Sequence, residues 1–240
     1  ADAMIFAMRY PKSRQLILRR TFPELERSLI RSARELFPTE ISEYSAKLHS
    51  YGFSNGSLIE FGSCEHESDV YKYQSAEYDV IRFDELTHFT EYQYLYLISR
   101  VRGTNGYPKQ VKSTTNPGGI GHTWVRSRFV DVAPPGCMYG TAGSTRIFIP
   151  ARISDNSFLM KSDPGYIERL KSLPERERRA LLDGDWNITE GRYFPEFDYE
   201  KHTCPDIPLP PSWRRYRAID YGLDRLACLW IAVDDEKEPN

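Results

Sequence analysis

The chain has 240 residues, with 32 Lys and Arg against 34 Asp and Glu, so its formal net charge is −2. This balance excludes a strongly basic protein that binds nucleic acid through its overall field, and leaves only local clusters for that task. The length fits one α/β domain with additional structure, or two modest domains. Cys64, Cys137, Cys204 and Cys228 have no paired spacing, which argues against a zinc site or a disulfide framework. With no visible signal peptide or membrane-spanning segment, we expect a soluble intracellular protein.

The first third of the sequence predicts a helix, a buried strand, a second helix and a hairpin. Residues 3–8 carry apolar side chains at helical spacing, and a Tyr-Pro pair at 10–11 ends the pattern. Residues 15–20 read QLILRR, an apolar run typical of a strand. Residues 23–36 predict the second helix. Residues 52–63 predict a hairpin whose turn is the Ser-Asn-Gly-Ser segment at 54–57.

The next apolar run, residues 80–83, ends in two acidic residues, Asp84 and Glu85. A buried strand that delivers Asp-Glu at its carboxyl end is typical of P-loop NTPases. There the first acid holds Mg²⁺, mostly through water, and the second orients or deprotonates the attacking water. Adjacent strand residues face opposite ways, so both acids can share a site only if the strand ends there and the chain turns. The alternative is a structural strand before a helix capped by Thr87, Thr90 and Glu91.

A second short strand runs into a polar loop at residues 110–119, which read QVKSTTNPGG. A polar side chain after this strand, Thr115 or Asn116, would sense the γ-phosphate of a nucleotide. Each residue of the loop also favours turns in its own right, so an ordinary turn is the alternative. Strands at 16–18, 80–83 and 111–113 would form a parallel sheet that places Asp84 and Asn116 at one edge.

The remaining sequence continues the alternation of helices and strands. Helices are expected at 89–102 and 124–130, a strand at 146–150, and a charged helical stretch at 164–183 that breaks at Pro174. This order argues for a parallel sheet covered on both faces. Residues 191–212 are rich in Pro, Phe and Tyr without periodicity, which indicates a linker. A hairpin follows at 216–233, with Asp220 near the end of its first strand and Asp224, Asp234 and Asp235 in or after it.

The order of these motifs resembles the large terminase subunit of tailed bacteriophages, the motor that packages DNA into capsids. The residues LRRTFPEL at 18–25 are similar to its post-strand motif, Asp84-Glu85 to its Walker B motif, and TTNP at 114–117 to its coupling motif. A lid-like pattern follows at 155–159, 166–167, 173–174 and 184–186. Finally, AIDYG at 218–222 resembles the first strand of the family's ribonuclease H-like nuclease.

The resemblance implies an additional-strand, RecA-like P-loop NTPase fold: a central parallel sheet with helices on both faces, followed by the first hairpin of a ribonuclease H-like nuclease domain. The implied organisation is an ATPase core at 1–150, a lid at 151–190, a linker at 191–212 and the start of the nuclease at 213–240. The phosphate-binding loop of such a fold is expected immediately before Ala1, and no Gly-rich segment with Lys-Ser/Thr occurs within the sequence. We therefore assign both activities to the parent protein and expect this chain to be incomplete for each.

The resemblance also implies a function and its cofactors. An ATP-hydrolysing motor would translocate viral double-stranded DNA into a procapsid, and a nuclease would cleave that DNA. ATP with Mg²⁺ would serve the motor, and Mg²⁺ or Mn²⁺ the nuclease. The implied site residues are Glu85, Asp84 and Asp220 for catalysis, with Asp84 and Asp220 as metal ligands; Arg19, Arg20, Thr114, Thr115 and Asn116 for nucleotide binding; and Lys72 as a basic residue acting in trans. Arg19 and Arg20 could instead face a neighbouring subunit or form a salt bridge at a helix N-terminus.

Partners implied by the family are the viral DNA, the portal protein, the small terminase subunit and further copies of this subunit in a ring on the procapsid, with no membrane. The location would be the host cytoplasm and, transiently, the procapsid, but not the mature virion. Two features depart from the family pattern. Arg82 interrupts the apolar pattern of the strand that ends in Asp84. It could lie near a contact with another subunit, or it could snorkel, with its stem on apolar surface and its charge in water. Lys72 stands where an arginine finger is expected, and Lys lacks the planar fork of Arg; a solvated surface Lys is the alternative.

Two other functions remain open from the sequence. One is a different P-loop enzyme, such as a helicase-like ATPase, against which the long pattern from the lid to Asp220 argues. The other is a non-catalytic assembly module that contacts the portal, the small subunit or DNA.

Overall fold

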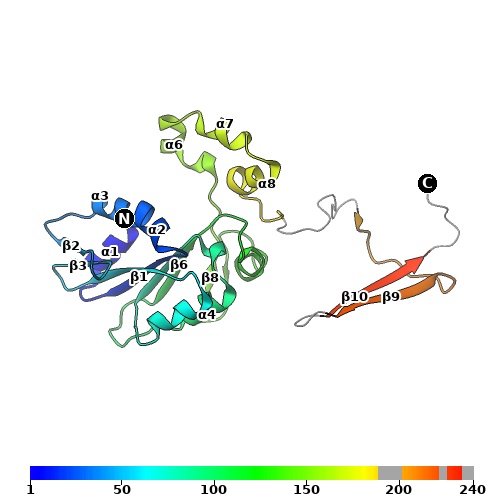
Figure 1. Ribbon diagram of the computed structural model, residues 1–240, viewed down its shortest axis with the longest axis horizontal. Coiled ribbons are helices and arrows are strands. Elements are labelled where there is room, and N and C mark those ends of the chain that lie inside the picture. The colour runs from blue at the N-terminus through cyan, green and yellow to red at the C-terminus, as the bar shows by residue number, and fades with distance from the viewer. Residues whose placement is uncertain (189–201, 222–225, 234–240) are drawn as a thin grey trace. The chain divides into compact units, whose positions relative to one another are not determined.

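The computed structural model describes residues 1–188, 202–221 and 226–233, and the chain divides into two compact units, Ala1–Gly191 and Arg192–Asn240 (Figure 1). The first unit is built on a six-stranded sheet of order β2-β3-β4-β1-β5-β6. Its strands are β1 (Arg14–Arg19), β2 (Ser42–Ser45), β3 (Ser50–Phe53), β4 (Leu58–Ser63), β5 (Val80–Asp84) and β6 (Gln110–Thr114).

The sheet is mixed, with a parallel half that carries the acidic strand. β1 pairs in parallel with β4 and β5, and β5 pairs in parallel with β6. β2 and β3 add to the other edge as antiparallel strands, and β3–β4 is the hairpin predicted at 52–63. The three strands predicted at 16–18, 80–83 and 111–113 are confirmed, and they are mutually parallel. β6 forms the edge and is exposed along its whole length, and its Lys112 is a charge of the kind that blunts edge strands.

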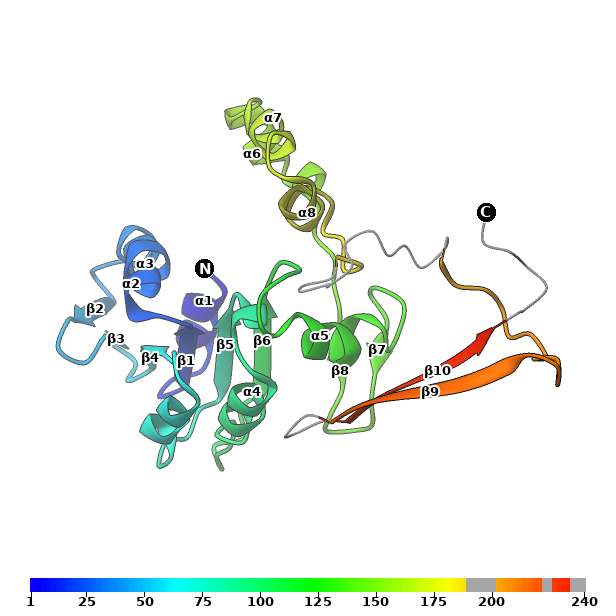
Figure 2. The same ribbon diagram turned by 45° about the vertical axis from the view of Figure 1, so that its right-hand side comes forward.

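Helices cover both faces of this sheet, as Figure 1 and Figure 2 show. α1 (Asp2–Arg9) and the continuous run α2 (Phe22–Leu25), η1 (Glu26–Ile30) and α3 (Arg31–Leu36) pack on one face. η2 (Glu67–Tyr73), α4 (Glu91–Ile98) and α5 (His122–Val125) pack on the other. Alternation along β1 sorts its side chains between the two cores, since Leu16 and Leu18 join the second core while Ile17 packs against the first.

Two predicted elements are shorter than expected. The helix predicted at 89–102 begins only at Glu91, because Thr90 caps it: the N–H of Gln93 donates to Thr90 Oγ1 (3.2 Å) and the N–H of Thr90 donates to Gln93 Oε1 (2.9 Å). The strand predicted at 146–150 is reduced to β8 (Arg146–Ile147), which pairs with β7 (Met138–Tyr139). The helix predicted at 124–130 instead begins at His122 and continues into η4 (Arg126–Val130).

Arg82 is explained by a contact within the chain. It faces α1, where its Nη2 donates to Asp2 Oδ2 at 2.7 Å and its Nη1 donates to Gln15 Oε1 at 2.5 Å. Lys112 on β6 also donates to Asp2, at 2.8 Å. The carboxylate of Asp2, in the first turn of α1, therefore neutralises Arg82 and links α1 to β5 and β6.

Residues 151–188 form a helical segment, here called the lid. Its elements are η5 (Ile153–Asp155), α6 (Ser157–Ser162), α7 (Tyr166–Lys171), α8 (Glu175–Arg178) and η6 (Arg179–Asp183). The predicted break at Pro174 is confirmed, because this residue is the N-cap of α8. η6 ends at Gly184, which adopts the left-handed conformation (φ 61°) that glycine favours at a helix C-terminus.

The second unit contains an antiparallel hairpin of β9 (Arg214–Tyr221) and β10 (Leu226–Val233), as predicted at 216–233. Residues 191–201 of the expected linker and the turn of the hairpin lie outside the described residues. The expected domain divisions at 150, 190 and 212 stay predictions. No helix in the described ranges is long and apolar enough to cross a membrane.

Candidate functional site

The carboxyl ends of three adjacent parallel strands bring the polar residues of the sequence motifs to one edge of the sheet. The register pairs Leu18 of β1 with Phe83 of β5, and Asp84 of β5 with Thr114 of β6. The residues that follow each pair therefore leave the sheet together, on the side where open α/β folds place their ligands. Asp84 is partly exposed there, with 24% of its side chain accessible.

The carboxylate of Asp84 is held from both neighbouring strands. Thr114 Oγ1 donates to its Oδ1 at 2.7 Å, and Arg19 Nε lies 3.5 Å from its Oδ2. A carboxylate beside a hydroxyl is a set of hard oxygens of the type that Mg²⁺ selects, and this ion needs only one or two protein carboxylates when substrate phosphates complete its shell. Asp84 and Thr114 thus fit a magnesium site.

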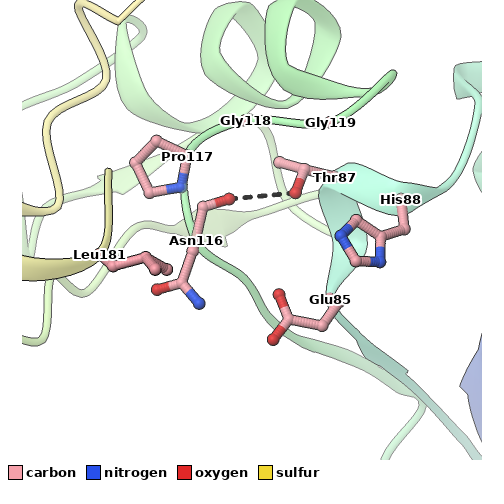
Figure 3. Close-up of a pocket in the computed structure, with 8 residues that line it drawn as sticks. All are labelled: Glu85, Thr87, His88, Asn116, Pro117, Gly118, Gly119 and Leu181. Atoms are coloured by element: carbon pink, nitrogen blue, oxygen red, sulfur yellow. Dashed lines mark hydrogen bonds between the residues drawn. The ribbon is translucent and has the colours of Figure 1, made fainter. Parts of the chain in front are cut away.

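Glu85 directly follows the end of β5 and adopts a left-handed backbone (φ 56°, ψ 60°). This conformation is uncommon for a residue with a side chain, and it tends to occur where function requires it. The strand ends at Asp84 and the chain turns at Glu85, so both acids lie at the carboxyl end of β5. Glu85 opens into a pocket of about 290 Å³ (Figure 3). The pocket is lined by Glu85, Thr87, His88, Asn116, Pro117, Gly118, Gly119 and Leu181.

A pair of threonines fastens the loop after β6 to the loop after β5. The N–H of Thr87 donates to Thr115 Oγ1 at 3.1 Å, and the two hydroxyls lie 2.9 Å apart. Thr87 Oγ1 also donates to the backbone oxygen of Asn116 at 3.0 Å. Because the hydroxyl of Thr115 is engaged here, the carboxamide of Asn116, which projects into the pocket near Glu85, is the better placed of the two to meet a ligand (Figure 3).

Glycines permit the close approach of these two loops. A Cβ on Gly119, whose φ is +82°, would lie 2.7 Å from the backbone oxygen of Thr87. A Cβ on Gly121 would lie 2.5 Å from the oxygen of Phe89 and 2.6 Å from Trp124 Nε1. The N–H of Gly121 in turn donates to the oxygen of Thr87 at 2.7 Å. Side chains at these two positions would therefore force the two loops apart.

The lid reaches the site at two points. Leu181 of η6 lines the pocket beside Pro117. Trp186, just after η6, stacks on the buried His122 with ring centroids 5.4 Å apart, and its oxygen accepts a bond from Arg126 Nη1 at 2.9 Å. His122 Nδ1 accepts the N–H of Gly118 at 3.0 Å. A continuous set of contacts thus runs from the loop after β6 to the lid.

The other basic residues expected at the site have different surroundings. Arg20 Nη1 donates to the backbone oxygen of His88 at 3.4 Å, beside the pocket. Lys72 lies on η2 with 61% of its side chain exposed and forms an ion pair with Asp69 at 2.9 Å. Hydrogen bonds from the N–H of His66 and from Lys72 lower the pKa of Asp69 to about 2. The action of Lys72 in trans stays a prediction.

Asp220 lies near the end of β9, is exposed, and pairs with Ala227 across the hairpin. Asp224, Asp234 and Asp235 lie outside the described residues. Within residues 1–188, 202–221 and 226–233, no three His, Cys, Asp or Glu side chains gather in a group able to hold a metal ion. The role of Asp220 as a metal ligand stays a prediction.

Three pocket residues were missed by the sequence reasoning. Thr87 was weighed only as a helix cap, although its position two residues after Glu85 was a signal that it borders the site. His88 follows it and had the same signal. For Leu181 the sequence contains no such signal, because only the tertiary fold brings the lid to the edge of the sheet.

A mostly parallel sheet with helices on both faces, an Asp-Glu strand end and a polar neighbouring strand end are typical of P-loop NTPases, the fold class of this chain. A family model described as "Terminase large subunit, T4likevirus-type, N-terminal" matches residues 1–201. The chain therefore belongs to this family. A search of curated proteins gave no match.

Solved structures of the large terminase from a thermophilic bacteriophage have a similar fold. Crystal form 2 of that protein superposes with a TM-score of 0.63 at 16% identity, covering 98% of this chain and 55% of that one. The complex of that protein with ADP gives a TM-score of 0.59 at 16% identity, covering 98% of this chain and 56% of that one. The complex with ATP-gamma-S gives a TM-score of 0.57 at 16% identity, covering 97% of this chain and 55% of that one. This chain thus spans about half the length of these relatives.

Proposed function

We propose that this chain is the ATPase portion of a DNA-packaging motor, in which ATP hydrolysis at the carboxyl edge of the sheet drives viral double-stranded DNA into a procapsid. The observation that carries the proposal is the meeting of Asp84, Glu85 and Asn116 at one sheet edge, in a chain of the large terminase family. The family membership favours this function over a helicase-like ATPase.

Each residue has a task that its geometry supports. Asp84, steadied by Thr114, would hold Mg²⁺, which supplies charge neutralisation at the phosphates when bound. Glu85 would orient or deprotonate the attacking water, because the left-handed turn directs it into the pocket. Asn116 would sense the γ-phosphate with its carboxamide.

Hydrolysis would be transmitted through contacts already described. Loss of the γ-phosphate changes the position of Asn116, and the Thr87–Thr115 pair makes the two strand-end loops move together. Gly118 then carries the displacement to His122, which stacks on Trp186 of the lid. The lid is in this way the moving part of the motor cycle.

The remaining partners are part of the same proposal. In the full-length protein, Asp220 would hold one of two metal ions, Mg²⁺ or Mn²⁺, in a nuclease that cuts the packaged DNA. The portal protein, the small terminase subunit and further copies in a ring on the procapsid would complete the assembly in the host cell. Asp220→Asn should abolish Mn²⁺-dependent nicking of plasmid DNA while ATPase activity remains.

The test of the ATPase site separates the two acids in the full-length protein. Glu85→Gln should still bind ATP but lose hydrolysis by roughly 10²-fold or more, the usual size of a lost general base. Asp84→Asn should instead weaken magnesium-dependent nucleotide binding. Glu43→Gln, an exposed carboxylate on β2 at the far edge of the sheet, is the matched control and should leave both properties unchanged.

Equal and mild effects of the two substitutions at Asp84 and Glu85 would place these acids outside the chemistry. A full-length protein that binds neither ATP nor Mg²⁺ would instead favour the non-catalytic assembly module. Turnover and equilibrium nucleotide binding are therefore measured on each variant.

A further inference from the structure

The side chain of Arg19, the last residue of β1, lies against the carboxylate proposed to hold magnesium. Its Nε is 3.5 Å from Asp84 Oδ2, while its Nη1 donates to Ser28 Oγ at 2.6 Å. Only 20% of the side chain is exposed. Within the described residues Nε is buried and has no hydrogen-bond partner. The contact with Asp84 is therefore an ion pair that is longer than a hydrogen bond.

The two oxygens of Asp84 have unequal surroundings. Oδ1 accepts a hydrogen bond from Thr114 on β6, and Oδ2 faces Arg19 on β1. The backbone register fixes this arrangement, because Leu18 pairs with Phe83 and the next residue of each strand follows directly. A metal ion bound at Oδ2 would therefore lie beside the guanidinium of Arg19.

Arg19 also has a second acid within reach. Glu24 Oε2, on α2, lies 4.0 Å from the same Nε atom, and 46% of the Glu24 side chain is exposed. The guanidinium is thus placed between two carboxylates and anchored by Ser28. A small rotation about its side-chain torsions can exchange one carboxylate for the other.

We propose that Arg19 is a positioning residue that competes with Mg²⁺ for Asp84, and that Glu24 takes over its guanidinium when the metal is bound. The inference rests on the proposed ATPase function and gives Arg19 a role different from direct contact with the nucleotide. Before the metal arrives, Arg19 neutralises Asp84 and keeps its carboxylate oriented. The positive charge then lowers the affinity for the incoming cation, so the site fills only when nucleotide phosphates add their own charge.

The experiment measures divalent-ion binding directly. Mn²⁺ is titrated into the full-length protein with saturating ADP and followed by electron paramagnetic resonance. Arg19→Gln should tighten Mn²⁺ binding by about tenfold, the change expected when a unit charge roughly 6 Å from a divalent ion is removed in a water-like dielectric. Arg19→Lys keeps the charge and should stay within about twofold of the wild type. Glu24→Gln should weaken Mn²⁺ binding, because Asp84 is then the one remaining of the two carboxylates that pair with the guanidinium in the described part of the chain.

The control is Arg102→Gln, which removes the same charge from an exposed side chain paired with Glu77. It lies near the beginning of β5, at the opposite end of the strand from Asp84, and should not change Mn²⁺ affinity. ADP binding in the presence of EDTA is measured for every variant, and Arg19→Gln should leave it unchanged.

Unchanged or weaker Mn²⁺ binding in Arg19→Gln overturns the inference, and weaker ADP binding in EDTA assigns Arg19 to the nucleotide instead. If Arg19→Gln does not fold, unchanged Mn²⁺ affinity in Glu24→Gln overturns it equally. Wild-type protein that binds no Mn²⁺ with ADP overturns the proposed function as well. Wild-type binding without the predicted shifts overturns only the role of Arg19.

Discussion

Gly121 is the position where a single methyl group should disturb the site most. Its backbone angles (φ −92°, ψ 0°) are open to any residue, so the need for glycine is purely one of space. An added Cβ would lie 2.5 Å from the oxygen of Phe89, 2.6 Å from Trp124 Nε1 and 3.0 Å from the oxygen of Thr87. Two of these atoms are backbone and cannot rotate away.

The cost of Gly121→Ala follows from these contacts. Overpacking of this kind destabilises by about 1–3 kcal/mol. Two hydrogen bonds are also strained: the N–H of Gly121 to the oxygen of Thr87 (2.7 Å) and Trp124 Nε1 to the oxygen of Phe89 (2.9 Å). Each bond contributes about 1 kcal/mol, so we expect a total loss of about 3–5 kcal/mol if both are broken.

The assay is urea unfolding followed by tryptophan fluorescence, since Trp124 is in direct contact with the substituted position. Gly52→Ala is the control, because a Cβ there meets nothing within 4 Å on an exposed strand position. It should be neutral or slightly stabilising. A loss below about 1 kcal/mol in Gly121→Ala would refute the argument that the neighbouring backbone atoms leave no room for a side chain at this position.

Two further predictions concern the lid and the opposite end of the sheet. Trp186→Ala should undock the lid and speed hydrogen exchange across residues 157–183 by roughly tenfold or more. Phe158→Ala is the control and should not change the exchange, because Phe158 is 81% exposed in the same lid. Equal exchange rates in both variants would contradict the docking role of Trp186. Burial acts to raise the pKa of Asp79, but hydrogen bonds from Lys109 and the N–H of Arg14 outweigh it and lower that pKa. The carboxylate therefore stabilises the fold above its unfolded pKa of about 3.9, and this stability is lost as the pH falls through the lower folded pKa. Asp79→Asn should cost about 1–3 kcal/mol at pH 7 and flatten the acid limb of the pH–stability curve; an unchanged acid limb would show that another group is responsible.

Much of the sheet could be predicted from local pattern. The short segments that end in Arg19, Asp84 and Thr114 each contain Val, Ile or Leu, and each proved to be a parallel strand. The adjacent acids of the Asp-Glu pair required a turn after the first, and Glu85 makes it with a left-handed backbone. Local sequence was sufficient here, because strand ends and turns depend on a few neighbouring residues.

Pairing across the fold could not be predicted in this way. The sequence left Arg82 open between a subunit contact and snorkelling, and the fold pairs it with Asp2 of α1. The sequence left Arg19 open between nucleotide, a neighbouring subunit and a salt bridge at a helix N-terminus. The fold adds a contact with Asp84, because β1 and β5 lie side by side. Leu181 lines the pocket from the same lid whose Trp186 stacks on His122, a contact between segments far apart in the sequence.

The strands, their acidic and polar ends and the family can all be read from the order of residues along this chain. Which charges meet, and which lid residue closes the pocket, is settled only once the chain has folded. Hydrophobic periodicity encodes which face of an element is buried, whereas contacts between distant elements depend on strand order and register, which no local pattern records.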